Sequence, residues 1–306
     1  MGESDVSEIV VMTGATGGLG AHAAALIAAR PETRLFIGAR GSGRSGPTGT
    51  EVLQLDLASL ASVRAFAEAI KKRLDGRPID RLVLNGGVQY SDMDQRSADG
   101  FEAAFAVNHL AHYLLARLLL PCMAENGRLV ITTSDTHDPR INPLAPRSLD
   151  PQTLAHPKGK GGPGAGMRAY SASKLCNLLT ARTLSALDEA TARRIEVIAY
   201  NPGFTLGTSL MRTAPPWMRN VLDGRFGRSL LLFVSRFLRQ LYPGTPERAG
   251  DVLAQLVEGE LTLPPGRIYV SLVRGEVTFP DPSPLALSDE AAECLWRESA
   301  AMVGVN

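Results

Sequence analysis

The chain has 306 residues, a formal net charge of +1 at pH 7 and no long basic block, so its charge gives no support for binding nucleic acid. Hydrophobic residues make up 44% and charged residues 21%, which is ordinary for a globular protein with one large α/β domain or two small ones. Its 3 cysteines are widely spaced and its acidic amino terminus lacks a long apolar run. Neither a disulfide framework nor a secretory signal is indicated, and we expect a cytoplasmic protein.

A glycine-rich turn follows the first predicted strand. Residues 8–12 (EIVVM) form the apolar, β-branched run of a buried parallel strand, residues 13–20 (TGATGGLG) come next, and a helix is expected over 20–30. A glycine turn between a strand and a helix lets the backbone approach a pyrophosphate at the helix N-terminus. The order TGxxxGxG therefore predicts a dinucleotide cradle, and a plain tight turn is the alternative.

The second predicted strand, residues 34–38, ends beside a basic residue, Arg40. The acidic residue that would bond the adenosine ribose 2′-hydroxyl is absent there. A guanidinium matches a 2′-phosphate, so Arg40 favours NADP(H) over NAD(H), with a surface arginine as the alternative. Arg44, in the glycine- and serine-rich loop over 41–50, is a second candidate for that phosphate.

Three more buried strands are predicted at residues 51–55, 80–84 and 128–133. The carboxyl ends of parallel strands face the ligand crevice of an open sheet. The residues brought to that edge are Asp56, then Asn85, Gly86 and Gly87, and finally Ser134. We expect Ser134 to be placed for a hydrogen bond to a substrate oxygen, and a turn serine is the alternative.

A long helix is predicted over residues 99–123, with Asn108 on or beside its apolar stripe. A buried asparagine needs partners, so Asn108 either bonds backbone groups or positions water in a site. His109 and His112 stand three residues apart, but no third ligand has suitable spacing and we expect no metal site.

A tyrosine and a lysine one helical turn apart lie in a helix predicted to run from residue 167. Side chains at i and i+4 share a helix face, so Tyr170 and Lys174 can point into one cavity. The lysine would favour the phenolate and lower the pKa of Tyr170 from its usual value near ~10, as suits a general acid or base. A half-buried tyrosine beside a solvated lysine is the alternative.

Two segments are expected to border a substrate. Residues 138–169 are rich in proline and glycine and predict an extended surface insertion. Residues 211–241, inside a predicted lid over 205–245, alternate large apolar side chains with arginines. Three interpretations stay open for this segment: a lid over an apolar substrate, an interfacial membrane helix over 229–241, and a contact in a homo-oligomer.

The rest of the chain continues the alternation of strands and helices. Strands are predicted at 194–199 and 267–272, a helix begins at Thr245-Pro246-Glu247, and Ser288 caps a last helix to about residue 303. This pattern predicts a single doubly wound α/β domain with a Rossmann-type parallel sheet of about seven strands, in which residues 8–133 mainly bind the cofactor.

The motifs occur together in the order of a known family. Over about residues 8–275 the chain resembles the short-chain dehydrogenase/reductase family through Thr13-Gly14-xxx-Gly18-x-Gly20, Asn85-Gly86-Gly87, Asn108, Ser134, Tyr170-xxx-Lys174 and Asn201-Pro202-Gly203. The sequences of residues 97–121 and 169–181 resemble those of the branch that holds protochlorophyllide reductases and retinol-type dehydrogenases.

The resemblance implies a role for each matching residue. Tyr170 would be the general acid or base, and Lys174 would lower its pKa and hold the nicotinamide ribose. Ser134 would polarise a carbonyl, and Asn108 would anchor a water of the proton relay. The implied cofactor contacts are Gly14, Thr16, Gly18, Leu19 and Gly20 at the pyrophosphate and ribose, Asp56 and Leu57 at the adenine, Asn85, Gly86 and Gly87 at the riboses and ring, Tyr170, Lys174, Pro202 and Gly203 beside the nicotinamide, and Thr205 or Thr208 near its carboxamide or the phosphates.

The sequence departs from the family pattern at three places, which limits what the resemblance implies about activity. Gly86 replaces the usual middle alanine of Asn-Ala-Gly, and the crossover after the second strand is short. Phe204 stands where protochlorophyllide reductases carry a cysteine proposed as proton donor, which argues against light-driven reduction of that pigment. We expect NADP(H)-dependent hydride transfer between a ketone and an alcohol of a bulky apolar small molecule. Reduction of a C=C bond and a non-catalytic cofactor-sensing protein are the alternatives.

Overall fold

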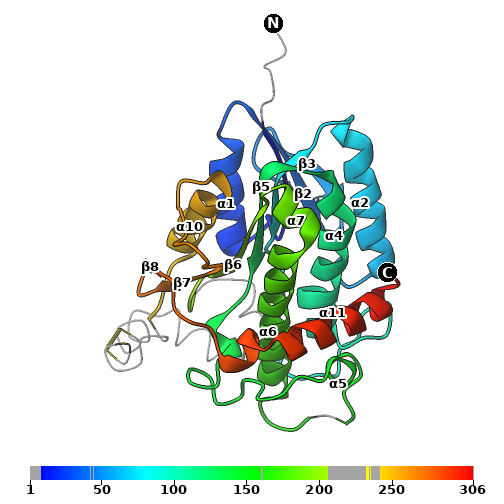
Figure 1. The fold of residues 1–306 in the computed structure, drawn as a ribbon, viewed down its shortest axis with the longest axis vertical. Helices are drawn as coiled ribbons and strands as arrows, with labels where there is room; N and C mark the ends of the chain where they lie inside the picture. Colours follow the sequence, from blue (N-terminus) through cyan, green and yellow to red (C-terminus); the bar gives the residue numbers. More distant parts are fainter. Residues whose placement is uncertain are drawn as a thin grey trace, which may run out of the picture.

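A computed structural model of the protein describes residues 8–41, 43, 45–159, 161–205, 232–233, 235 and 242–305. These residues form one sheet of eight strands in the order β3-β2-β1-β4-β5-β6-β7-β8 (Figure 1). All neighbours pair in parallel except β7 and β8. The predicted doubly wound α/β fold is confirmed, with one more strand than expected. The strands are β1 (Glu8–Thr13), β2 (Thr33–Ala39), β3 (Glu51–Gln54), β4 (Ile79–Leu84), β5 (Met123–Thr132), β6 (Glu196–Asn201), β7 (Tyr269–Val273) and β8 (Glu276–Thr278).

Helices cover both faces of the sheet (Figure 1). Helices α1 and α10 pack together on one face, while α2, α4 and α6 cover the other and α11 lies across α6 and α4. Within the described residues the helices are α1 (Gly18–Ala28), α2 (Leu60–Leu74), α3 (Ala103–Phe105), α4 (Ala111–Leu119), α5 (Pro151–Ala155), α6 (Ala165–Ala186), α7 (Asp188–Ala192), α10 (Pro246–Glu258) and α11 (Asp289–Val303). The same part of the chain also contains the short helical segments η1 (Ala106–Leu110), η2 (Leu120–Cys122), η3 (Asp135–His137) and η6 (Pro284–Leu287).

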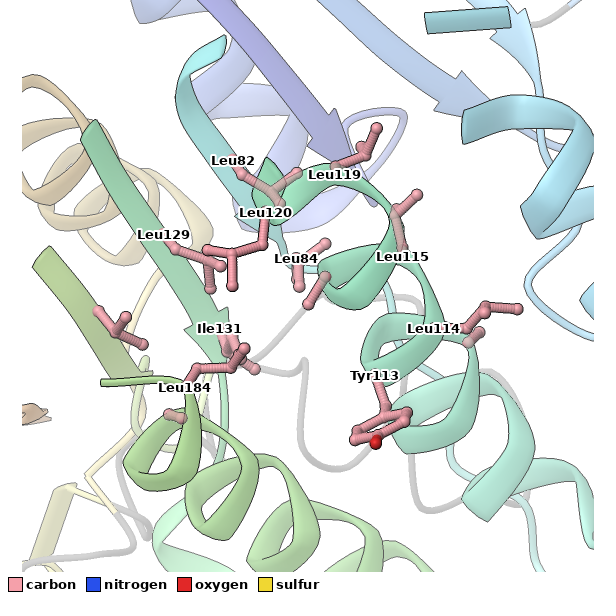
Figure 2. Packing of buried hydrophobic residues seen from close by; sticks show 14 of the residues in the cluster. Leu82, Leu84, Tyr113, Leu114, Leu115, Leu119, Leu120, Leu129, Ile131 and Leu184 are labelled. Atoms are coloured by element: carbon pink, nitrogen blue, oxygen red, sulfur yellow. The ribbon is translucent and has the colours of Figure 1, made fainter. Parts of the chain in front are cut away.

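The core follows from the alternation of side chains along the strands. In β1, Ile9 and Val11 face the side of α2 and α4, whereas Val10 and Met12 face α1 and α10, and all four are fully buried. Figure 2 shows the first of these layers, where Leu82 and Leu84 of β4 and Leu129 and Ile131 of β5 meet the leucines of α4 and Leu184 of α6. The helical run over residues 103–122 is long and apolar enough to span a membrane, but most of it is buried here as a core helix.

The helix expected over 99–123 begins later and is interrupted. It starts at Ala103, because the Glu102 carboxylate accepts hydrogen bonds from the backbone N–H groups of Ala104 and Phe105. A five-residue π-helical segment, η1, then separates α3 from α4 and contains Asn108. Widened turns of this kind often occur at functional sites.

The insertion over 138–169 is not the extended segment that its composition predicts. It contains α5, which Asp150 caps, and the first turn of α6. The Asn142 amide nitrogen donates to Ser171 Oγ at 2.9 Å, which fastens the insertion to α6. The segment therefore contains helical structure and is bonded to α6, while about half of its described residues are exposed.

The segment expected to form a lid lies largely outside the described residues. Of 205–245, the structure describes 205, 232–233, 235 and 242–245. The three interpretations of residues 211–241 stay predictions.

The eighth strand was missed because it is only three residues long. It follows a two-residue hairpin turn, Arg274-Gly275, in which both residues have positive φ (55° and 80°). Arginine-glycine followed by a short alternating run, EVTF, is the signal that could have indicated it.

Candidate active site

The turn between β1 and α1 can hold a pyrophosphate. Gly14 has φ +67°, and a Cβ there would lie 2.6 Å from the Gly86 backbone nitrogen. A Cβ on Gly20 would collide with the Gly14 carbonyl oxygen, so both positions need glycine for close packing. Gly17 is the N-cap of α1, it has no side chain that could cap the helix, and the space beside its Cα is open. The first N–H groups of α1 and the positive end of its dipole therefore face a free volume suited to phosphate.

The Thr13 hydroxyl and the Asn85 side chain join this turn to the end of β4. Thr13 Oγ1 accepts hydrogen bonds from the backbone nitrogens of Asn85 and Gly86, each at 3.0 Å. The Asn85 amide donates to the Gly14 carbonyl at 3.2 Å and accepts from Thr132 Oγ1 at 2.8 Å. The Asn85 side chain thus ties β1, β4 and β5 together, and its predicted contact with a ribose stays a prediction.

The residues predicted at the adenine end lie at the carboxyl ends of β2 and β3. Arg40 follows β2 and is exposed, and its charge reaches Tyr90, where it opposes the rise in pKa that burial causes. Asp56 accepts a hydrogen bond from Ala58 N. Leu57 packs closely on Gly86: a Cβ added to Gly86 would lie 2.5 Å from Leu57 Cδ1. Arg44 lies outside the described residues.

Tyr170 and Ser134 meet although they are far apart in the sequence. Tyr170 lies in α6, Ser134 follows β5 at the carboxyl edge of the sheet, and the two side chains are close enough for Ser134 to act on the pKa of the phenol. Both are buried. Burial raises the pKa of Tyr170, the neighbouring Ser134 lowers it in part, and the charge of Asp135 raises it further.

Lys174 lies beside the phenol of Tyr170 and beside Gly87, but it does not bring the pKa of Tyr170 below its usual value as predicted. Its Nζ is 5.7 Å from the centre of the Tyr170 ring, would lie 3.5 Å from a Cβ at Gly87, and donates to the Thr132 carbonyl at 3.1 Å. Burial lowers its own pKa to about 8. The expectation that Lys174 brings the pKa of Tyr170 below its usual value is wrong for this structure, because burial of the phenol dominates.

Asn108 is fully buried and joins three parts of the site. Its Oδ1 accepts from Val88 N at 2.8 Å, and its Nδ2 donates to the Val88 carbonyl and to Ser173 Oγ, both at 2.9 Å. His112 Nδ1 lies 3.0 Å from the Asn108 carbonyl oxygen. Since a carbonyl only accepts, this nitrogen carries the hydrogen, and His112 Nε2 accepts from Thr13 Oγ1 at 3.0 Å. Of the two roles open to Asn108 in the sequence, bonding to backbone groups is the one observed, and its role toward a relay water stays a prediction.

The loop after β6 lies close to β7. Gly203 has φ +70°, its nitrogen donates to Asn201 Oδ1 at 3.0 Å, and a Cβ would strike the Leu272 carbonyl oxygen. Thr205 Oγ1 lies 3.2 Å from the Pro202 carbonyl oxygen. Thr208, predicted with Thr205 near the cofactor, lies outside the described residues.

Two residues next to Ser134 were not expected in the site. His137 is buried, and its Nδ1 donates to the Ser134 carbonyl at 2.6 Å, while its Nε2 accepts from Ser283 N. Asp135 has protein on most sides and lines a cleft with Pro202, Gly203, Phe204 and Leu272. The sequence signal for both was only their position just after a strand end that carries a candidate residue.

The amino-acid sequence is similar to those of known proteins. The family model described as short chain dehydrogenase matches residues 8–142. The chain is 32% identical to protochlorophyllide reductase A of Oryza sativa subsp. japonica, over 97% of this chain and 81% of that protein. It is 33% identical to dehydrogenase/reductase SDR family member 13 of Homo sapiens, over 96% of this chain and 73% of that protein.

Solved structures share the fold. An uncharacterized protein from Mycobacterium paratuberculosis is 26% identical, with a TM-score of 0.68 over 99% of this chain and 96% of that one. A short chain dehydrogenase from Burkholderia cenocepacia, solved in complex with NADP, is 23% identical with a TM-score of 0.56, over 83% of this chain and 92% of that one. At that identity the likeness concerns the fold alone.

Proposed function

The chain belongs to the short-chain dehydrogenase/reductase family and is an oxidoreductase, and on that premise we propose that it transfers hydride between NADP(H) and a ketone or secondary alcohol of a bulky apolar substrate. One observation carries the proposal. The side chains of Tyr170, Ser134 and Lys174 lie close together, and Lys174 Nζ also reaches Gly87, in the loop after β4 that packs against the glycine turn suited to a dinucleotide.

The residues present fit a nicotinamide dinucleotide. The open space over Gly17 and the free N–H groups of α1 would hold the pyrophosphate, and Leu57 would flank the adenine. The loop of Pro202 and Gly203, held against β7, would border the nicotinamide. When bound, the cofactor supplies or accepts the hydride.

The chain's own groups handle the proton and the oxygen. In reduction, Tyr170 would donate its phenolic proton to the substrate oxygen, and Ser134 would stabilise the negative charge that develops there. Burial suits Tyr170 to this role because it keeps the phenol protonated until a stronger base forms beside it.

NADP(H) is favoured by Arg40. Its side chain is exposed at the carboxyl end of β2, beside which a dinucleotide bound to this type of fold would carry its adenosine ribose. A guanidinium there can bond a 2′-phosphate.

An apolar substrate is favoured by the cleft beside Ser134. The cleft is lined by Phe204, Tyr242, Leu272 and Val273 together with Asp135. With a volume of about 20 Å³ the cleft holds about one water molecule, so a large apolar group would contact these side chains at its mouth.

A second candidate is reduction of a C=C bond on the same scaffold. It is favoured by similarity to several protochlorophyllide reductases, which are 29–32% identical to this chain. Tyr170 would then protonate a carbon or an enolate oxygen. A purely cofactor-sensing protein would have no need for the buried proton-transfer pair of Tyr170 and Ser134.

The experiment is a titration of the protein with NADPH and NADH by fluorescence, followed by incubation with saturated and α,β-unsaturated apolar ketones. We expect tighter binding of NADPH and conversion of ketones to secondary alcohols. Equal affinities would remove the preference for NADP(H). Saturated ketones as products would favour the second candidate, and tight NADPH binding without turnover of any ketone would favour a sensor.

A further inference from the structure

A buried histidine lies between two polar residues of the candidate site. His112 belongs to α4 and is almost completely buried. Its Nε2 lies 3.0 Å from Thr13 Oγ1, at the end of β1, and its Nδ1 lies 3.0 Å from the carbonyl oxygen of Asn108, in η1. The proposed reaction gives this histidine no role.

The two partners of His112 hold opposite ends of one loop, residues 85–88, which follows β4. At the start of the loop, two successive backbone N–H groups donate to Thr13 Oγ1, each at 3.0 Å. At its end, the backbone N–H and carbonyl of Val88 bond the Asn108 side chain at 2.8 and 2.9 Å. His112 therefore joins the two side chains that fix this loop.

The hydrogen bonds of Thr13 assign a definite role to His112. A threonine hydroxyl carries one hydrogen and two lone pairs. The two N–H groups of the loop occupy both lone pairs, so the hydroxyl hydrogen must go to an acceptor. His112 Nε2, at 3.0 Å, is nearer than the Val83 carbonyl oxygen, at 3.5 Å. The imidazole thus fixes the rotation of the hydroxyl at which both lone pairs face the loop.

The ring hydrogen of His112 has one position that satisfies these contacts. The Asn108 carbonyl only accepts, so Nδ1 carries the hydrogen and Nε2 keeps its lone pair. Burial lowers the pKa of His112 to about 4, and the charge of Lys174 acts in the same direction, so the ring is neutral near pH 7. A hydrogen on Nε2 would compete with the N–H groups of the loop for the same hydroxyl oxygen.

The loop that His112 holds also lies beside the lysine of the candidate site. A Cβ added to Gly86 would lie 3.4 Å from His112 Nε2. At the next residue, a Cβ added to Gly87 would lie 3.3 Å from Asn108 Oδ1 and 3.5 Å from Lys174 Nζ. A shift of the loop would therefore change where a ribose that lies on it meets Lys174.

We propose that His112 is a positioning residue for the dinucleotide: with its hydrogen on Nδ1, the imidazole joins Thr13 to Asn108 and holds the 85–88 loop in the place that a nicotinamide ribose contacts. The proposal rests on the proposed function, because this loop is the expected contact of that cofactor. It concerns binding of the cofactor and does not depend on which substrate is reduced.

The test measures NADPH affinity by fluorescence titration for His112→Phe, His112→Gln and His109→Phe. Phenylalanine keeps a ring but offers no acceptor, and loss of the bond to Thr13 should weaken NADPH binding about tenfold. The glutamine amide oxygen can take the place of Nε2 and accept from Thr13, so His112→Gln should stay within about threefold of the unaltered protein. His109 is equally buried but bonds Ser299 of α11, so His109→Phe is the matched control and should keep the original affinity.

Hydrogen exchange locates the effect on the loop without turnover. In His112→Phe without cofactor, the backbone amides of Asn85 and Gly86 should exchange about tenfold faster than in the unaltered protein, because the Thr13 hydroxyl is no longer fixed. The amides of β1 should exchange as slowly as before. Unchanged exchange at both loop amides would overturn the proposal.

Two results of the titrations would also overturn it: equal NADPH affinity for His112→Phe and the unaltered protein, or a loss in His109→Phe as large as that in His112→Phe. If His112→Phe does not fold, nitrogen NMR of the unaltered protein decides. The ring hydrogen of His112 should be on Nδ1 at pH 7, and a hydrogen on Nε2 would contradict the proposal. If the affinities change as expected while no ketone is reduced, the proposed function fails and the role of His112 stands.

Discussion

At Tyr170, burial and the neighbouring Ser134 act on the pKa of the phenol in opposite directions. Loss of water raises this pKa, and Ser134 lowers it only in part. Lys174 Nζ donates a hydrogen bond to the Thr132 carbonyl, and burial lowers the pKa of Lys174 to about 8. Near neutral pH the pair is therefore a neutral phenol beside an ammonium, which is the state needed to donate a proton to an oxygen.

Arg40 should decide between the two nicotinamide cofactors. A charge-assisted bond to a 2′-phosphate contributes about 1.5–3 kcal/mol, or about 10–100-fold in affinity. We expect Arg40→Ala to weaken NADPH binding by that factor and to leave NADH binding within about twofold, as measured by fluorescence titration. Lys72→Ala, an exposed lysine in the last turn of α2, is the control. A loss shared equally by NADPH and NADH would contradict the assignment of Arg40.

Among the elements, the β1–α1 turn contains two kinds of glycine: Gly20 is needed for the packing of the fold, and Gly17 leaves room for a ligand. Gly20 has no room for a Cβ against the Gly14 carbonyl, whereas the space at Gly17 is open. Gly17→Ala should therefore cost at most about 1 kcal/mol of stability, or about 2 °C in Tm, and yet weaken nucleotide binding about tenfold or more by crowding the phosphate.

Gly20→Ala is the contrasting variant, because its methyl group must displace backbone. We expect a loss of about 1–3 kcal/mol in the free energy of unfolding together with a loss of binding. Urea titrations and NADPH titrations of both variants measure the two effects separately. If Gly17→Ala bound NADPH as tightly as the unaltered protein does, the cradle would have to lie elsewhere.

The elements also show what the sequence could and could not predict. Thr245 and Ser288 were correctly expected to begin helices, because capping depends on neighbours within three residues. The π-helical turn at Asn108 was not predictable, since its bonds reach Val88 and Ser173, which are 20 and 65 residues away. His137 was missed for the same reason, because its Nε2 bonds Ser283 N, 146 residues away.

Across the whole molecule, two buried histidines couple the fold to pH. His109 bonds Ser299 of α11 at 2.8 Å, and His112 bonds Thr13 of β1. Burial lowers their pKa values to about 3 and about 4. The unfolded chain binds protons at these sites from about pH 6.5 downward while the folded chain does not, so stability falls as the pH drops below that value. Asp135 acts in the opposite sense, because its raised pKa lets the folded state take up a proton between about pH 6 and 4.

His109→Gln isolates one of these contributions. Between pH 7 and 5, protonation of His109 in the unfolded chain should cost the unaltered protein ~2 kcal/mol, and the variant should lack that loss. Urea unfolding at the two pH values measures it, with His156→Gln, an exposed histidine, as the control. An equal decrease in stability for His109→Gln and the unaltered protein would show that His109 does not contribute in this way.

The most direct measurement follows deuterium from NADPH labelled at the transferable position of its nicotinamide into the product of an apolar ketone, with mass spectrometry to locate the label. We predict one deuterium on the carbinol carbon, and a fall in turnover of about 10²–10⁴-fold for Tyr170→Phe at unchanged NADPH affinity. Tyr113→Phe, at a buried tyrosine that bonds the Trp296 carbonyl outside the site, should keep full activity. Product without label, or undiminished turnover by Tyr170→Phe, would contradict hydride transfer at this site.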